Sequence, residues 1–206
     1  MLIEYRNYFE SLLSIPIEQI EQASGILITA TQDRDLTPEG WVTRLPICAF
    51  ETDTAIIISC SPGLKSRLNA VLSTSAVPNA IPNIREFINS EKSLHMAHIY
   101  YRIFGLDEES AIYDVTDVVL LSSLHSSETI PNKPYKIIEL GVNTRVEHRR
   151  KGYATAVCSA FIRHHLQQGI KPMWSCAFDN IESETLAMKL GFKYMGNIFY
   201  TAALGC

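Results

Sequence analysis

The sequence lacks the cysteine pattern of a metal site or a disulfide framework. Its five cysteines are an odd number, and no two of them form a CxxC pair. The longest apolar runs, such as residues 55–58 and 118–121, are far shorter than the roughly 18 residues that a membrane span needs. The opening residues have no basic start followed by an apolar core, so they do not predict a secretory signal. A reducing, cytoplasmic compartment is the simplest interpretation, and secretion as an effector without a cleaved signal stays open.

Neither sign of charge is in marked excess. The chain of 206 residues has 18 Lys and Arg against 22 Asp and Glu, which gives a formal net charge of −4. Proteins that bind nucleic acid usually have the opposite bias, so DNA or RNA is not the expected partner. Hydrophobic residues make up 47% and charged residues 19%, a composition that excludes a disordered tail or a charged coiled coil. The length allows one domain or one domain with a substantial addition.

The first half of the chain has the pattern of a small α/β unit. A helical periodicity over residues 3–22 is interrupted by Pro16. Strands are then predicted at 25–31, 44–50 and 55–60, with a hairpin turn at 51–54, and a helix at 62–72. Residues 73–83 have a linker-like composition with two prolines. We therefore predict an N-terminal α/β helper subdomain at residues 1–92 and a second domain at residues 93–206.

The second half predicts a sheet with helices inserted between its later strands. Runs rich in Ile, Val, Tyr and Thr predict strands at 98–106, 111–123 and 135–144. Apolar residues at helical spacing predict a helix at 154–166, followed by a strand at 172–178, a helix at 181–190 and a strand at 192–201. This order predicts an α/β (α+β) fold with a central mixed sheet flanked by helices.

Three consecutive cations, Arg149, Arg150 and Lys151, lie where a predicted strand leads into the long predicted helix. The helix dipole disfavours each cation at a helix N-terminus, by up to about 1 kcal/mol. Gly152 and the small Ala154 let backbone N–H groups approach an anion closely, and the first turn of a helix has free N–H donors. The segment therefore predicts a phosphate or pyrophosphate cradle, with a solvated basic loop as the alternative interpretation.

This segment has the form R-x-x-G-x-A, which resembles the acyl-CoA pyrophosphate loop of GNAT-family acetyltransferases. The surroundings extend the likeness, because a predicted strand precedes the loop, a long helix follows it, and residues 186–192 resemble the closing helix and Gly-Phe turn of the family. The resemblance covers about residues 95–201. Residues 1–90 do not match the common core, so the chain is most similar to a branch with an N-terminal extension, which includes antibiotic-resistance-type members.

The resemblance implies acetyl-CoA as co-substrate, and nothing in the sequence indicates a metal. It assigns the pyrophosphate to the loop residues Arg149, Arg150, Lys151, Gly152, Tyr153 and Ala154, the pantetheine arm to Thr144 and Val146, and further contacts to Asn180 and Ser183. The family often has a tyrosine seven residues after this asparagine as the general acid, whereas the present chain has Ala187. Tyr194 and Tyr200 are expected to be strand residues that pack the sheet, with replacement of that acid by either of them as the alternative.

Direct transfer to an amine also requires a base, because a primary amine with a pKa of about 10 is mostly protonated at neutral pH. Glu139, on the predicted strand before the loop, is the candidate catalytic base, with an ordinary strand carboxylate as the alternative. We therefore predict an N-acetyltransferase that moves an acetyl group from acetyl-CoA directly to an amine of a small molecule or protein, with no DNA or membrane partner.

Two alternatives stay open at this point. A GNAT-fold acyl-CoA-binding sensor or interaction module with weak catalysis is favoured by Ala187. A toxin or effector that acetylates a macromolecule is the second alternative. The acceptor and the oligomeric state are not indicated by any feature of the sequence.

Overall fold

The computed structural model describes residues 5–37, 43–90, 96–106, 122–127 and 136–204. The helices are α1 (Arg6–Leu13), α2 (Ile17–Gln22), α3 (Pro62–Leu72), α4 (Val77–Ser90), α5 (Tyr153–Gln167) and α6 (Ile181–Lys189), with short 3₁₀ turns η2 (Gln32–Asp35) and η3 (Val146–His148). The strands are β1 (Gly25–Ala30), β2 (Thr43–Arg44), β3 (Ile47–Glu51), β4 (Ala55–Cys60), β5 (Met96–Gly105), β6 (Ser122–Ser127), β7 (Ile137–Thr144), β8 (Lys171–Ala177) and β9 (Lys193–Leu204). The strand predicted at 111–123 lies mostly outside the described residues.

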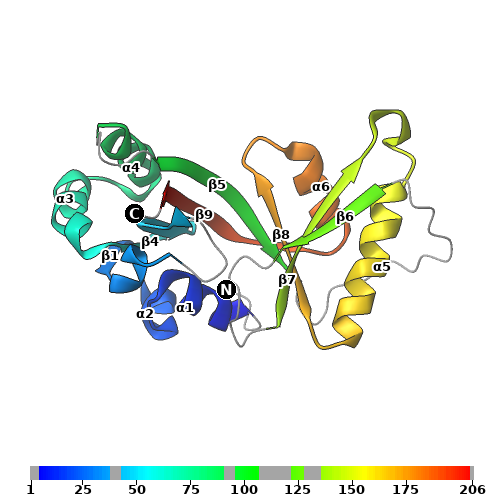
Figure 1. Cartoon of the computed structure of the whole chain (residues 1–206), viewed down its shortest axis with the longest axis horizontal. Coiled ribbons are helices and arrows are strands. Elements are labelled where there is room, and N and C mark those ends of the chain that lie inside the picture. Colours follow the sequence, from blue (N-terminus) through cyan, green and yellow to red (C-terminus); the bar gives the residue numbers. More distant parts are fainter. Residues whose placement is uncertain (1–4, 38–42, 91–95, 107–121, 128–135, 205–206) are drawn as a thin grey trace.

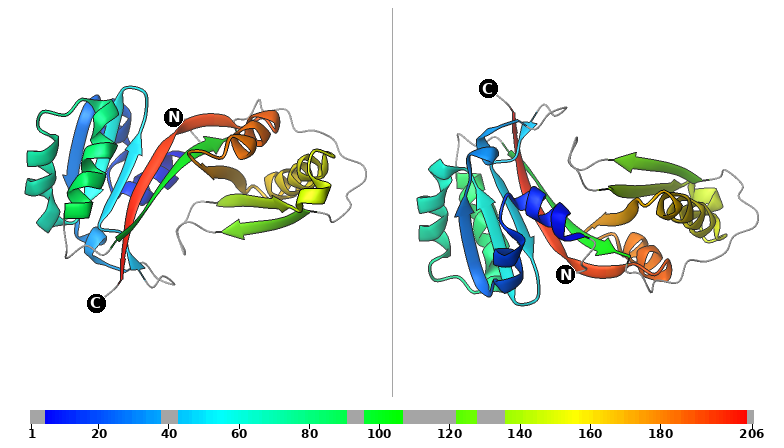
Figure 2. Two further views of the ribbon diagram at one scale, coloured as in Figure 1. Left: turned by 90° about the horizontal axis from the view of Figure 1, so that it is seen from above. Right: turned by 90° about the horizontal axis from the view of Figure 1, so that it is seen from below.

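The described strands form one mixed sheet of nine, in the order β1-β4-β3-β9-β5-β8-β7-β6, with β2 paired to β9 beside this path. The long strands β5 and β9 run from the part of the molecule with α3 and α4 to the part with α5 and α6 (Figures 1 and 2). This arrangement confirms the predicted fold class, a central mixed sheet flanked by helices. The division at residue 92 stays a prediction, and the sheet crosses it because β9 pairs with β3 as well as with β5.

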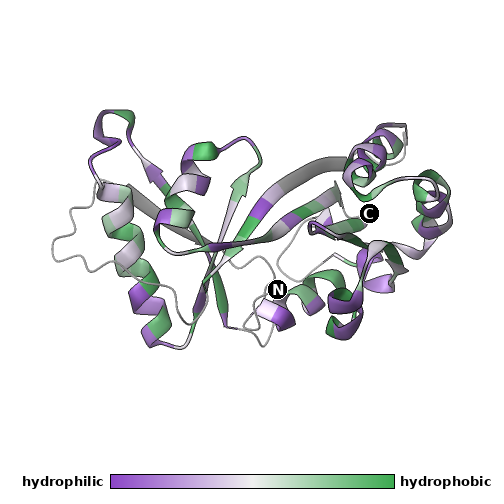
Figure 3. Ribbon diagram, turned by 180° about the vertical axis from the view of Figure 1, so that it is seen from behind, coloured by the Kyte–Doolittle hydropathy of each residue, from purple (hydrophilic) through white to green (hydrophobic). Residues whose placement is uncertain are grey.

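Helices cover both faces of the sheet, and alternate strand residues enter different cores. On one face, α1 and α2 pack on a cluster that includes Phe50, Ile103 and Ile198. On the other face, α3 and α4 share a cluster with Phe199, while α5 and α6 share one with Phe104. Hydrophilic and hydrophobic residues accordingly alternate along the helices of both halves (Figure 3). No helix among the described residues has the length and apolarity needed to cross a membrane.

The linker-like interpretation of residues 73–83 is wrong over most of its length, because α4 begins at Val77. Pro78 fits the first turn of a helix, where a backbone N–H has no partner. Pro82 lies inside the helix and costs on the order of 3 kcal/mol. The helix nevertheless buries one apolar face, composed of Ala80, Ile81, Ile84, Phe87 and Ile88. Each large apolar side chain contributes roughly 1.5–3 kcal/mol on burial, so packing outweighs the proline.

Tyr5, at the start of the described chain, forms hydrogen bonds with the second half. Its side chain is fully buried, and its hydroxyl donates to the carbonyl oxygen of Pro172 (2.7 Å) and accepts from the backbone N–H of Leu106 (2.9 Å). These two partners lie at the start of β8 and just after β5. Since an unmade buried hydrogen bond costs about 1–3 kcal/mol, this tyrosine stabilises the association of α1 with the sheet.

Candidate functional site

Strands β7 and β8 separate part-way along their length. Their parallel pairing runs from Ile137 opposite Lys171 to Leu140 opposite Trp174. Beyond this point β7 continues to Thr144 along β6, and β8 continues to Ala177 along β5. The sheet therefore opens between the ends of the two strands, and the residues that enclose the opening come from the segments that follow each strand.

The loop after β7 has a backbone suited to an anion. Arg150 has a φ of 60° and Gly152 a φ of 86°, between residues of negative φ, and this alternation is typical of anion-binding nests. No described side chain caps α5, and its first intrahelical bond runs from the N–H of Ala156 to the carbonyl of Gly152. Several N–H groups at this helix end are therefore available to a ligand.

Gly152 is required for its backbone conformation rather than for space. A Cβ atom at this position would meet no protein atom within 4 Å. Its φ of 86°, however, is a conformation that costs other residues roughly 1–2 kcal/mol. Glycine at this position therefore allows the turn that directs the N–H groups of the loop into the opening.

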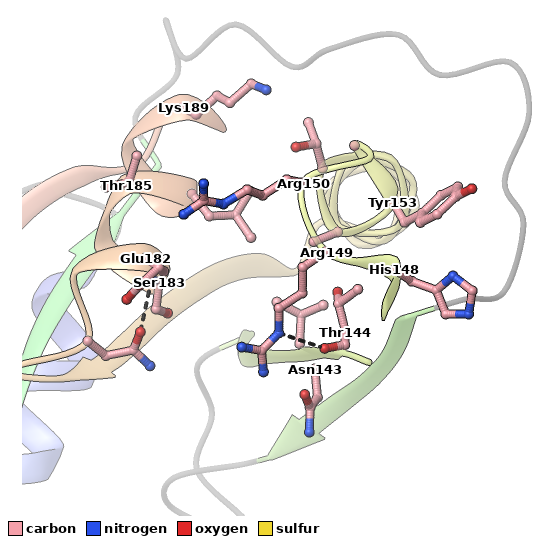
Figure 4. Close-up of a pocket in the computed structure, with 16 residues that line it drawn as sticks. Asn143, Thr144, His148, Arg149, Arg150, Tyr153, Glu182, Ser183, Thr185 and Lys189 are labelled. Atoms are coloured by element: carbon pink, nitrogen blue, oxygen red, sulfur yellow. Dashed lines mark hydrogen bonds between the residues drawn. The ribbon is translucent and has the colours of Figure 1, made fainter. Parts of the chain in front are cut away.

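A pocket of about 750 Å³ lies between the loop, the end of β7 and α6. This volume is within the range of small-molecule and cofactor sites. Three cations, Arg149, Arg150 and Lys189, line it together with one carboxylate, Glu182. In Figure 4 the side chain of Arg149 extends toward β7, where its Nε donates to the carbonyl of Thr144 (3.1 Å), whereas Arg150 extends toward α6.

The start of α6 forms the opposite wall of the pocket. The side-chain oxygen of Asn180 accepts from the backbone N–H of Ser183 (3.1 Å) and so caps the helix. The hydroxyl of Ser183 accepts from Nε1 of Trp174 (3.0 Å), a fully buried residue of β8. Arg102 of β5 forms an ion pair with Glu184 at the same helix. These contacts hold the α6 wall in place.

Most of the predicted co-substrate residues come together at this pocket. Those that line it are Thr144, Arg149, Arg150, Gly152, Tyr153, Ala154, Asn180 and Ser183. Lys151 is exposed and is not among the lining residues, and the Val146 side chain is 74% exposed in η3, away from them. The assigned roles of all ten residues stay predictions.

Glu139 lies outside the pocket lining, at the closed end of the strand opening. It stands opposite Met173 in the last part of the β7–β8 pairing. Its carboxylate accepts a hydrogen bond from the hydroxyl of Ser175, the residue that follows the last paired position of β8. Met173 packs with α1, so Glu139 occupies the sheet face opposite α5 and α6.

Tyr200 lies on the same face as Glu139. Burial raises the pKa of the Tyr200 hydroxyl, and the nearby Tyr101 and Glu139 raise it further. The phenol therefore remains protonated throughout the neutral range. Tyr194 has a side chain that is 47% exposed and packs against Phe104, on the α6 side of the sheet.

Ala187 is fully buried in the cluster beneath α5 and α6. A larger side chain at this position would enter the core rather than the pocket. Position 187 therefore has no side chain that could act as general acid in the pocket, whereas the GNAT family often has a tyrosine at the matching position.

The four cysteines among the described residues are buried, which disfavours a nucleophilic role for them. Cys176 is buried, and burial raises the pKa of its thiol, so the reactive thiolate is disfavoured. Among the described residues, no group of three or more His, Cys, Asp or Glu side chains could hold a metal ion.

Sequence reasoning missed one face of α6. Glu182, Thr185 and Lys189 line the pocket at spacings of three and four residues. Helical periodicity, extended from Asn180 along the predicted helix, would have identified this face. No pattern in the sequence would have identified the hydrogen bond from Ser175 to Glu139.

Comparison with known proteins shows which family the segment that forms this site resembles. The family model described as GNAT acetyltransferase matches residues 127–201, which include the strand opening, the loop and the α6 wall. This segment is therefore similar to the GNAT family. The family is one of acyltransferases, and its acetyltransferases use acetyl-CoA and amine acceptors in general.

The GNAT segment also resembles a curated protein. Uncharacterized N-acetyltransferase YdfB of Bacillus subtilis (strain 168) is 42% identical over 55 residues, which are 27% of the present chain and 21% of the relative. The chain thus spans about a fifth of the length of the curated relative that it matches.

Two solved structures are similar to more of the chain at low identity. An acetyltransferase of the GNAT family from Colwellia psychrerythraea is 11% identical, with a TM-score of 0.47 over 70% of this chain and 75% of that one. A GCN5-related N-acetyltransferase-like protein from Streptococcus suis 89/1591 is 14% identical, with a TM-score of 0.42 over 88% of this chain and 90% of that one.

Proposed function

We propose that the protein is an N-acetyltransferase that moves an acetyl group from acetyl-CoA directly to an amine of a small molecule or a protein. The observation that carries this proposal is the pocket in which an uncapped helix start, Arg149 and Arg150 adjoin the opening between β7 and β8. Helix N-termini and arginine side chains are well suited to bind phosphate groups.

The residues present fit acetyl-CoA in chemistry and in length. The backbone of residues 150–154 would hold the pyrophosphate, and the end of β7 at Thr144 would pair with the amide groups of the pantetheine arm. Glu139 lies five residues before Thr144, so a strand rise of about 3.3 Å per residue separates them by roughly 17 Å. This separation is on the scale of an extended pantetheine arm, which would bring the thioester toward Glu139.

Glu139 would then act as the base. The amine nitrogen forms a bond to the acetyl carbon, the carbon–sulfur bond breaks, and CoA leaves as a thiolate. Glu139 accepts the proton that the amine loses, directly or through a water molecule. Ser175 holds the carboxylate of Glu139 in its orientation. A thiolate with a pKa of about 8.5 is a tolerable leaving group, so late protonation by water suffices.

Calorimetry with acetyl-CoA tests the binding half of the proposal. Gly152→Ala should weaken acetyl-CoA binding by about tenfold or more, because the loop can no longer keep a φ of 86° without strain. Gly169→Ala is the matched control, since Gly169 has a φ of 69°, equally open surroundings and a place at the other end of α5. Equal affinities of both variants for acetyl-CoA would contradict the proposed site.

Release of free thiol from acetyl-CoA, measured against a panel of small amines, peptides and proteins, tests the transfer half. Acceptor-dependent release that Glu139→Gln abolishes would support an N-acetyltransferase. Buried Ala187 favours a second candidate, an acyl-CoA-binding sensor or interaction module without efficient catalysis. Tight acetyl-CoA binding without transfer to any acceptor of the panel would favour that second function.

A further inference from the structure

Four half-buried side chains from four strands share the sheet face opposite α5 and α6. They are Tyr101 of β5, Glu139 of β7, Ser175 of β8 and Tyr200 of β9, and each lies two residues from a side chain that packs in the cluster at α1 and α2. The hydroxyl of Ser175 donates to Glu139. Tyr101 and Glu139 both raise the pKa of Tyr200. The carboxylate and the two tyrosines are therefore near enough to interact, and we call these four residues the Glu139 cluster.

The Glu139 cluster lies on the acceptor side of the strand opening if acetyl-CoA binds as proposed above. The loop after β7 and the helix α6 line the co-substrate pocket from the other face of the sheet. An amine that gives its proton to Glu139 approaches the thioester from the face on which Glu139 lies. Tyr101 stands opposite Ala177, the last residue of β8, and so lies toward the open end of the strands. The cluster therefore contacts the part of the acceptor next to the amine.

The lysines of the described strands on this face lie away from the open end. Lys171 pairs with a residue two positions before Glu139, about 7 Å further from the opening. Lys193 begins β9, seven residues before Tyr200, which corresponds to about 20 Å along the strand. Neither lysine is therefore placed to neutralise an anion that enters at the opening.

The cations of α1 and η2, the elements near this face, are bound to other partners. Arg6 forms an ion pair with Glu21 (2.8 Å), and Arg34 is buried and donates to Ser59 (2.8 Å). Among the described residues, the groups that the cluster presents to an acceptor are thus one carboxylate, one hydroxyl and two phenol rings, without a cation.

A cluster of this composition favours an ammonium group and disfavours an anion. A carboxylate forms a charge-assisted hydrogen bond with an ammonium, and the faces of tyrosine rings attract cations. An acceptor with a carboxylate or phosphate next to its amine would bring a second negative charge close to Glu139. In half-buried surroundings the repulsion between two such charges is stronger than in water. Repulsive contacts of this kind are a common source of specificity.

We propose that the acceptor is an amine on an uncharged or cationic stem, and that the Glu139 cluster excludes amines with an adjacent carboxylate or phosphate. Alkylamines, arylalkylamines, polyamines and lysine side chains of proteins belong to this class, whereas free amino acids do not. This inference rests on the proposed function. The ammonium binds first at the cluster, and its proton then passes to Glu139 before the nitrogen attacks the acetyl carbon.

Acetyl transfer to matched pairs of an amine and its parent amino acid tests the inference. Phenethylamine against phenylalanine and agmatine against arginine are the probes, because the members of each pair differ only in the α-carboxylate. The wild type should have a kcat/KM at least about 30-fold higher for the amine, the effect of one like charge at short range. A pair of which neither member is acetylated is compared by competitive inhibition of transfer to the best acceptor, with the same ratio expected.

Two variants place a cation beside the cluster without changing Glu139. Tyr101→Arg and Ala177→Lys should each reduce the ratio to about threefold or less, by raising kcat/KM for the amino acid. Ala177 stands opposite Tyr101, so the second variant tests the same position of the cluster if the first does not fold. Tyr194→Arg makes the same change on the α6 side of the sheet and should keep the ratio of the wild type.

Two results would overturn the inference and leave the proposed function intact. One is an equal kcat/KM for the two members of every pair, or a higher value for the amino acid. The other is an unchanged ratio in both cation variants, which would show that the cluster does not select the acceptor. Binding of acetyl-CoA without transfer to any amine would instead remove the proposed function, and the inference with it.

Discussion

In the first half of the chain, every residue of β3 and β4 except Glu51 is buried, whereas β7 in the second half has a single buried residue, Leu140, among its eight. The pockets of the two halves also differ in the charge of their lining residues. The pocket of about 460 Å³ between β1, α3 and α4 has no charged residue in its described lining, while the pocket at α5 and α6 has three cations and a carboxylate.

Because of this difference, we expect the two ends of the sheet to have different roles, one in stability and the other in binding. The first half buries the side chain of Arg34 against its own elements, because this arginine donates to Ser59 (2.8 Å) and to the carbonyl of Leu12, near the end of α1. The second half leaves helix ends and cations exposed at the strand opening. We therefore expect changes in the first half to act on stability and changes at the opening to act on binding and turnover.

The largest effect is expected at the junction of the two halves. Gly196 of β9 has a φ of 147°, and a Cβ atom there would lie 2.5 Å from the carbonyl oxygen of Glu51. Gly196→Val should therefore lower the free energy of unfolding by at least about 3 kcal/mol, through strain and displacement of β3. Urea denaturation measures this loss. Gly63→Ala, at an open position of α3, should stay within about 1 kcal/mol of the wild type.

The next effect concerns the sheet face near the opening. Glu139→Gln should lower turnover at neutral pH by about 100-fold or more, because the amine loses its proton acceptor, with little change in acetyl-CoA affinity. Part of the loss should be recovered at high pH, where more of the amine is already deprotonated. Glu147→Gln, in the exposed turn η3, is the control. Equal turnover of Glu139→Gln and wild type at all pH values would leave Glu139 a structural carboxylate.

A smaller effect should separate stability from binding. Tyr5→Phe leaves the carbonyl of Pro172 and the N–H of Leu106 without their buried partner, at a cost of about 2 kcal/mol in the free energy of unfolding. Affinity for acetyl-CoA should stay within about twofold of the wild type, because Tyr5 is not among the residues that line the pocket. Tyr194→Phe, at a half-exposed position, should change stability little. A loss of acetyl-CoA binding in Tyr5→Phe would show that the two halves are coupled.

The smallest effect is expected for the tyrosine near Glu139. Tyr200→Phe should reduce turnover by less than tenfold, about 1.4 kcal/mol of barrier, because water can protonate the leaving thiolate. Since the pKa of Tyr200 is raised in the folded state, the unfolded state alone ionises above about pH 10, and stability falls there as pH rises. Tyr200→Phe should make that fall shallower. A thousandfold loss of turnover in this variant would identify Tyr200 as the general acid.

Much of the fold could be predicted because short-range patterns decide most helices and strands. The break between α1 and α2 at Pro16, the β3–β4 hairpin and the long helix α5 follow from periodicity and turn residues. The helix α4 could not be predicted in this way. Its prolines favour a linker locally, and only burial of its apolar face against β1, β4 and α3 reverses that preference.

At the site, the strand, the basic loop with Gly152 and the start of the helix could be predicted from the sequence alone. A nest and a helix N-terminus are formed by residues that are neighbours in the sequence. Tertiary structure alone decided which distant residues meet them. Ser175 and Glu139 are 36 residues apart, and Asn197 and Glu51, which join β9 to β3 (2.9 Å), are 146 residues apart. Such pairs depend on strand register and on the separation of β7 from β8, which arise only when the whole sheet forms.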